Sequence, residues 1–272
     1  MVEHPRRIRR RSVPVAPARS AVAVLLVALV TAGLTLVGSA ATGAEPLPVY
    51  HPSRLTSLGD ARQVVVVTAR SWSSSTAVLR TWQRAGDGDW RLRTGPVRAR
   101  VGYNGFVPAD ERRQGTGTSP AGTFAILSSF GNGADPGTAL PYRVVDRNDW
   151  WTYDPRDPST YNVLQPRRVA TARWRTSWAE DLSAYGGQYR FAAVLDFNLP
   201  GGVRRAADGQ RVADQPADTR LGGGIFLHVS GPGATAGCVS VPRDVMRRVL
   251  RWLDPAAEPV LVMGPRSAIT RL

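Results

Sequence analysis

Residues 222–241, GGGIFLHVSGPGATAGCVSV, hold the only cysteine of the chain, Cys238, and a histidine ten positions before it, His228. Residues 224–229 alternate as a strand does, with His228 on the face opposite the aliphatic side chains. The glycines and proline at 231–233 end that strand, and a second apolar alternation starts at Cys238. A strand, a tight loop and a returning strand would place the thiol beside the imidazole, since neighbouring strands lie about 4.8 Å apart.

The pair predicts nucleophilic chemistry. A thiol is a weak nucleophile until it ionises, and a partner imidazole lowers its pKa and holds the thiolate as an ion pair. Gly237, directly before Cys238, leaves the backbone uncrowded, so main-chain N–H groups near the nucleophile could form an oxyanion hole. These residues together indicate a Cys/His acyl-transfer site.

A second interpretation treats Cys238 as a small buried hydrophobe and His228 as a core histidine. In an exported protein an unpaired cysteine is unusual unless it is a reactive thiol or pairs between chains, which favours the catalytic interpretation. A structural zinc site would need more Cys and His ligands than this chain has. We therefore expect no metal and no cofactor.

The segment HVSGPGATAGCVSV, residues 228–241, resembles the active-site motif of the L,D-transpeptidases (the YkuD-type catalytic domain), which is a His, a glycine-rich loop and then Gly-Cys. Residues 114–124, QGTGTSPAGTF, resemble the second signature of that family. The resemblance covers about 95–264 and, more weakly, the segment from 60. The chain departs from the family pattern at Ser240, where Arg or Asn is common, and at Thr235 and the alanine after it, where a Ser is expected.

The resemblance implies a peptidoglycan cross-linking enzyme. Cys238 would attack the carbonyl of the donor stem's third residue and release D-alanine, while His228 takes the thiol proton and returns it to the leaving amine. The N–H groups of Gly237 and Cys238 would stabilise the oxyanion. The amine of a neighbouring stem would then resolve the thioester. Ser230, on the same face as His228, or a main-chain carbonyl would orient the imidazole.

Three further residues are candidates for substrate contacts: Thr235, Ser240 and Asn198. Turn capping explains Asn198 at least as well, since Pro200 and two glycines follow it. Two alternatives to the transpeptidase remain open from the sequence: an L,D-carboxypeptidase that resolves the same thioester with water, and a non-catalytic envelope-binding module with an inert thiol.

The N-terminal segment predicts export. Residues 1–44 combine arginines, an uncharged apolar run at 21–38 and small residues near Ala44, which is typical of a signal peptide; an uncleaved anchor helix is the alternative. Residues 45–59, with three prolines, are expected to be a linker. We expect the protein to act in the cell wall or on the outer side of the cytoplasmic membrane, with membrane contact only through an uncleaved segment.

The formal net charge is +14, and every cation is arginine because the chain has no lysine. The missing lysine excludes a phosphate-binding P-loop. A basic exported protein suits peptidoglycan stem peptides and anionic cell-wall polymers as partners. No helix-turn-helix, zinc-finger or RNA-recognition signature is found, so nucleic acid is not an expected partner.

The fold class expected is mainly β: one domain over 60–264 with mixed sheets and two or three short helices, followed by a tail at 265–272. Apolar or alternating runs predict strands at 63–68, 75–82, 90–93, 123–127, 190–198, 224–229, 238–241 and 259–263. A capping box at Ser177 and Glu180 predicts a short helix ending near Tyr185, and an amphipathic stripe predicts a helix over 242–253. Residues 201–221 are expected to be a flexible loop.

Overall fold

The computed structural model describes residue 48 and residues 50–166 and 171–272. The predicted signal segment, residues 1–44, lies outside the described residues. The described residues belong to one compact unit. Within the described ranges, no helix has the length and apolarity needed to cross a membrane.

The described residues are mainly β-strand, as expected, with a single α-helix. The strands are β1 (Gln63–Ala69), β2 (Thr76–Arg84), β3 (Trp90–Arg100), β4 (Phe106–Pro108), β5 (Ser119–Gly131), β6 (Tyr142–Val144), β7 (Trp150–Thr152), β8 (Leu164–Gln165), β9 (Ala179–Asp181), β10 (Ala192–Leu195), β11 (Gly201–Arg205), β12 (Arg211–Gln215), β13 (Phe226–Val229), β14 (Val239–Val241) and β15 (Val260–Pro265). The helix is α1 (Arg243–Trp252), and short 3-10 turns connect several strands.

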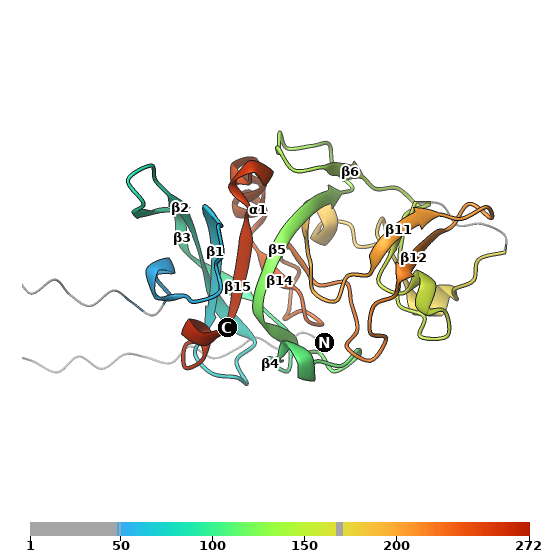
Figure 1. Ribbon diagram of the computed structural model, residues 1–272, viewed down its shortest axis with the longest axis horizontal. Coiled ribbons are helices and arrows are strands. Elements are labelled where there is room, and N and C mark those ends of the chain that lie inside the picture. Colours follow the sequence, from blue (N-terminus) through green and yellow to red (C-terminus); the bar gives the residue numbers. More distant parts are fainter. Residues whose placement is uncertain (1–47, 49, 167–170) are drawn as a thin grey trace, which may run out of the picture. The chain divides into compact units, whose positions relative to one another are not determined.

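The main sheet closes on itself. Its strands follow the order β10-β13-β14-β3-β2-β1-β15-β5, and β5 pairs again with β10, so that each strand of this ring has a neighbour on both sides. Closure leaves no strand of this ring as a free sheet edge, although β14 pairs with β3 only at Ser240 and Arg100. Figure 1 shows the long, curved β5 in green beside β15; β5 pairs with β15 through its first half and with β10 through its second half.

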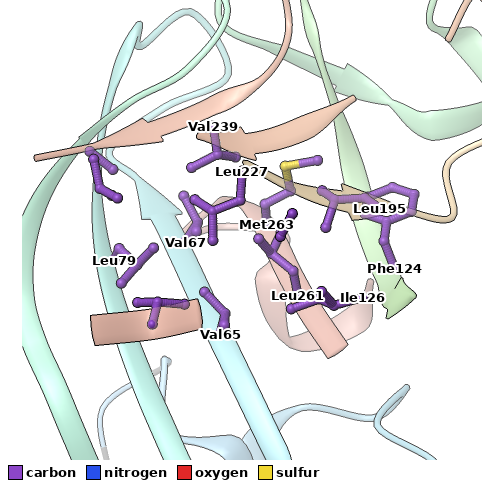
Figure 2. Close-up of a cluster of buried hydrophobic side chains, with 14 of the residues drawn as sticks. Val65, Val67, Leu79, Phe124, Ile126, Leu195, Leu227, Val239, Leu261 and Met263 are labelled. Carbon is purple, nitrogen blue, oxygen red and sulfur yellow. The ribbon is translucent and has the colours of Figure 1, made fainter. Parts of the chain in front are cut away.

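Aliphatic side chains fill the interior of the ring. Figure 2 shows Val65 and Val67 of β1 meeting Leu79, Leu227, Val239 and Met263 from four other strands. The alternate residues of β1, Val64 and Val66, face outward into a second buried cluster. Burial on both faces explains why β1 is a continuous β-branched run instead of an alternating one.

Helix α1 packs its apolar stripe on the same core. Val245, Met246, Val249 and Leu250 are buried, and they belong to the cluster that contains Leu227 and Val239 of β13 and β14. The arginines of the helix lie on its exposed side, as the amphipathic pattern predicted. The helix therefore supports the two strands that flank the predicted site.

The prediction of a short helix after Ser177 is wrong. Residues Thr176–Trp178 form one 3-10 turn, and Ala179–Asp181 form β9, which pairs with β7. Ser177 makes no cap, because the carboxylate of Glu180 accepts hydrogen bonds from tyrosine hydroxyls instead of reaching back to the turn. Pairing between strands distant in the sequence has overridden a local capping pattern.

Residues 201–221 are also more ordered than expected. Strands β11 and β12 form a hairpin, with Gly209 in the left-handed region (φ 84°) and an ion pair of 2.9 Å between Arg204 and Asp214. The Asp208-Gly209 turn was visible in the sequence, but polar residues dominate both strands and the buried Val212 and Ala213 are adjacent, so alternation did not reveal the strands. Figure 1 shows this hairpin at the opposite end of the domain from β1–β3.

The two segments that flank the predicted domain have ordered parts. Within the predicted linker, Pro52–Arg54 form a 3-10 turn and Leu55 is buried. Within the predicted tail, Ile269 is fully buried in the same outer cluster as Leu55. Both segments therefore cover the outward face of β1.

Candidate active site

The strands that carry the two predicted catalytic residues are neighbours in the ring, but they run parallel. Leu227 is paired with Val239, and His228 with Ser240. The second strand therefore does not return as a hairpin, which the sequence had suggested, and Cys238 lies level with Phe226 instead of directly opposite His228. His228 and Cys238 remain on the same face because they are offset by an even number of positions along paired strands.

The loop between these strands is fastened to the second signature segment. Thr235 makes two backbone hydrogen bonds to the residues that directly follow β3. Its N–H donates to the carbonyl of Val101 (2.9 Å), and its carbonyl accepts from the N–H of Tyr103 (2.8 Å). Ser119, from the signature at 114–124, donates from Oγ to the carbonyl of Gly237 (2.6 Å). The two signatures therefore meet at Gly237, the residue before Cys238.

Cys238 is a half-buried residue that lines a cavity. Sγ donates to the carbonyl of Gly224 (3.2 Å) and accepts from the N–H of Phe226 (3.4 Å). Burial raises the pKa of the thiol to about 12; the Phe226 N–H and Arg112 oppose that rise, and Glu180 adds to it. The resting form is therefore the neutral thiol.

The imidazole of His228 is buried and its orientation is fixed by the backbone. Nδ1 lies 2.9 Å from the carbonyl of Val229, and the ring of Tyr189 packs edge-on at 5.4 Å between centroids. A carbonyl only accepts, so Nδ1 carries the proton and Nε2 keeps its lone pair. Burial lowers the pKa of His228 to about 4, and the nearby backbone of Val229 and Gln188 opposes this shift.

The resting pair is therefore a neutral thiol and a neutral imidazole. This differs from the expected thiolate–imidazolium ion pair, and the reason is that desolvation penalises both charged forms. A neutral imidazole is the form that accepts a proton, so it suits a general base that acts as the thiol attacks.

Both side chains line one cavity of about 490 Å³. Its wall combines residues of the loop before β13, the loop before β14, the turn before β9 and the loop after β4. The lining residues that bear on the chemistry are Arg112, Gln114, Tyr153, Trp178, Glu180, Tyr185, Gln188, Tyr189, Gly224, His228, Thr235 and Cys238.

Two charged residues of this wall were not found by sequence reasoning. Arg112 is 2% exposed and stands two positions before the second signature. Glu180 accepts hydrogen bonds from the hydroxyls of Tyr153 (2.9 Å) and Tyr189 (2.7 Å), and burial raises its pKa. The sequence offered a signal only for Glu180, and the capping pattern assigned it another role.

The backbone of Gly237 has a conformation that favours glycine. Its φ is 143°, and a Cβ there would lie 2.9 Å from the carbonyl oxygen of Thr118, so a larger residue does not fit. Its N–H donates to Oγ1 of Thr235 (3.2 Å) and is therefore occupied within the loop. The N–H of Cys238 makes no hydrogen bond with the part of the chain that the structure describes, which leaves it free for an oxyanion.

Of the remaining predicted site residues, Thr235 lines the cavity and Ser230 and Ser240 do not. Ser240 is fully buried and accepts from Oγ of Ser230 (3.2 Å), and neither lines the cavity. The ring of His228 is oriented by the Val229 carbonyl and not by Ser230. Thr235 does line the cavity, while its Oγ1 donates to the carbonyl of Cys238 (2.6 Å).

Asn198 lies away from the cavity wall and acts as a brace. Its φ is 49°, and its Nδ2 donates to the carbonyls of Asp218 (2.8 Å) and Gly222 (2.6 Å). Asp218 returns a hydrogen bond from its N–H to Oδ1 of Asn198 (3.0 Å). The turn-capping interpretation therefore describes this residue, which fixes the loop that leads to the cavity.

Comparison with known proteins identifies the family of this chain. Residues 63–262 match the family model described as YkuD, L,D-transpeptidase catalytic domain. No curated protein and no solved structure gives a significant match. The matched region spans most of the chain and contains the cavity with His228 and Cys238. The chain belongs to the YkuD family of L,D-transpeptidase catalytic domains.

Proposed function

We propose that the chain is an exported peptidoglycan L,D-transpeptidase that works through a thioester on Cys238. The observation that carries the proposal is the meeting of the free thiol and the buried neutral imidazole in one cavity of a domain from this family. The family acts on peptidoglycan, which lies outside the cytoplasm, and the N-terminal pattern at 1–44 agrees with export.

In the first half-reaction the sulfur attacks the carbonyl carbon of the donor stem's third residue. His228 takes the thiol proton at Nε2, and the carbonyl oxygen becomes an oxyanion to which the Cys238 N–H can donate. When the tetrahedral intermediate collapses, the amide C–N bond breaks and His228 returns the proton to the departing D-alanine amine. The products are a thioester and free D-alanine.

In the second half-reaction an amine of a neighbouring stem attacks the thioester carbonyl. Neutral His228 accepts a proton from this amine, the C–S bond breaks, and the sulfur recovers a proton from the imidazole. Water in place of the amine would give a carboxypeptidase with the same thioester. Incubation with a purified tetrapeptide muropeptide, with and without an added acceptor amine, separates the two: a cross-linked mass identifies a transpeptidase, and a tripeptide alone identifies a carboxypeptidase.

The nucleophile is tested by Cys238→Ala, with Ser230→Ala as the matched control because Ser230 lies on the same face but outside the cavity. Both proteins are incubated with a carbapenem and their intact masses are measured. The wild type and Ser230→Ala should gain one adduct, and Cys238→Ala should gain none. An adduct that persists on folded Cys238→Ala would exclude this cysteine as the nucleophile, and absence of turnover on all muropeptides would favour the non-catalytic alternative.

A further inference from the structure

Arg112 is a buried cation that has no carboxylate partner among the described residues; its guanidinium lies 5.9 Å from the centre of the Phe197 ring. Its side chain is 2% exposed, and Nη1 donates to Oε1 of Gln114 (2.7 Å) and to the carbonyl of Leu221 (2.8 Å). Both acceptors are neutral. Among the described residues no carboxylate forms an ion pair with Arg112, and Nε is buried without a hydrogen-bond partner.

A buried charge of this kind is expensive unless something neutralises it. The thiol of Cys238 does not, because burial raises its pKa and it rests in the neutral form. Glu180 lines the same cavity, but its two oxygens are held by the hydroxyls of Tyr153 and Tyr189. The unbalanced charge therefore points to an anion that arrives from outside the protein.

The guanidinium is placed to meet such an anion next to the nucleophile. Arg112 lines the catalytic cavity, and its Nη2 would lie 3.4 Å from a Cβ built on Gly237, the residue that precedes Cys238. Nη2 makes no hydrogen bond with any described residue, so its donors remain available. A guanidinium suits a carboxylate, because its planar N–H groups match the two oxygens.

We propose that Arg112 is a carboxylate-binding subsite of the cavity, and that it holds the α-carboxylate of the residue that follows the scissile bond. This substrate assignment rests on the proposed function. Across one residue the carboxylate carbon lies within about 4 Å of the carbonyl carbon that the sulfur attacks. A cation beside the residue before the nucleophile is therefore at the right range.

The subsite would make the enzyme select chain ends. Only a C-terminal residue has a free α-carboxylate; in an internal residue, or in a terminal amide, that group is neutral and leaves Arg112 unpaired. Leaving a buried charge without a partner is costly, so discrimination follows from the burial of the guanidinium.

The first test uses two alkylating agents of similar size, iodoacetate and iodoacetamide, which differ in the carboxylate. Their rates with Cys238 are measured by intact mass, and the ratio is compared with the ratio for the unfolded protein. We expect the folded wild type to favour iodoacetate by at least about tenfold more than the unfolded chain, the factor that a charged hydrogen bond supplies. Arg112→Met should abolish that preference and Arg112→Lys should keep part of it.

Arg113→Met is the matched control, because Arg113 is the next residue, is exposed and does not line the cavity. It removes the same charge and should leave the iodoacetate preference unchanged. A merely structural role for Arg112 would slow or speed both reagents equally and would leave the ratio unaltered. An equal loss in Arg113→Met would assign the effect to overall charge and overturn the subsite.

A second test needs no variant and so decides the matter even if Arg112→Met does not fold. D-Alanine and D-alaninamide are added to the wild type, and the rate of alkylation by iodoacetamide is measured. Protection by D-alanine but not by its amide supports the subsite; equal protection, or none, overturns it. An iodoacetate preference together with D-alanine protection but no turnover of a tetrapeptide muropeptide would support the subsite and reject the proposed function.

Discussion

Lowering the pH should destabilise the domain through His228, because burial keeps its imidazole neutral in the folded state. The pKa is about 4 in the folded protein and 6.5 in the unfolded reference. Between these values the unfolded chain binds a proton that the folded chain does not. This contribution to stability is therefore complete above about pH 6.5 and is lost progressively as the pH falls to about 4.

The magnitude follows from the two pKa values. They differ by about 2.5, and each unit is worth about 1.4 kcal/mol, so His228 alone should lower the free energy of unfolding by about 3 kcal/mol between neutral pH and pH 4. That is a large fraction of the stability of a typical domain.

The assay is denaturant unfolding of the wild type and of His228→Gln at about pH 7 and about pH 4. The glutamine variant cannot take up the proton, while the carboxylates that titrate in this window are present in both proteins. The wild type should therefore lose about 3 kcal/mol more than the variant over this interval. The rate of carbapenem acylation by the wild type should also keep its neutral-pH value down to about pH 5, because the base stays unprotonated.

Equal pH dependence in the two proteins would refute the reasoning. It would mean that the imidazole has an ordinary pKa and is open to water, and the neutral resting pair would then have no basis. An acid limb of the acylation rate near pH 6.5 would lead to the same conclusion by an independent measurement.

Three further perturbations test the site and the core. Gly237→Ala should slow thioester formation at least about tenfold and lower the free energy of unfolding by about 1–3 kcal/mol. The reason is that φ is 143° and the new Cβ would press on the Thr118 carbonyl. Thermal melts measure the stability and adduct mass measures the rate, and an unchanged rate would contradict the prediction. Leu250→Ala should cost about 2–5 kcal/mol in denaturant unfolding, because the side chain is fully buried, and should still form the carbapenem adduct while folded. Glu180→Gln should lower the pKa of Cys238, because it removes a negative charge that raises it; the midpoint of alkylation rate against pH should move down, and an upward move would reject the assigned charge.

The sequence predicted that His228 and Cys238 lie together, and the structure places both in one cavity, because their placement is local. His228 and Cys238 lie on short strands separated by one loop, and period-two alternation fixes which side chains share a face. The direction of the second strand was not predictable, since alternation is the same in parallel and antiparallel pairs. The pairing register of β13 and β14 depends on the 230–237 loop, which is held by hydrogen bonds to residues directly after β3. These are contacts between residues far apart in the sequence.

The electrostatic part of the site could not be read from the sequence. Arg112 and Glu180 reach the cavity from segments that are far from Cys238 along the chain and that carry no periodic signal. Glu180 also satisfied a local capping pattern, and only the pairing of β9 with β7 shows why that pattern was misleading. Closure of the ring through β5 and β10 is likewise a contact between distant strands.

The pairing of β1 with β15 has a consequence for how the protein acquires its structure. Val64 is the partner of Val260, so two segments that are about 200 residues apart in the sequence must come together before the ring is complete. Bringing such remote segments together has a large entropic cost and slows folding. A growing polypeptide on the ribosome cannot close this ring until β15 has been synthesised, so every other strand of the ring must wait for its completion.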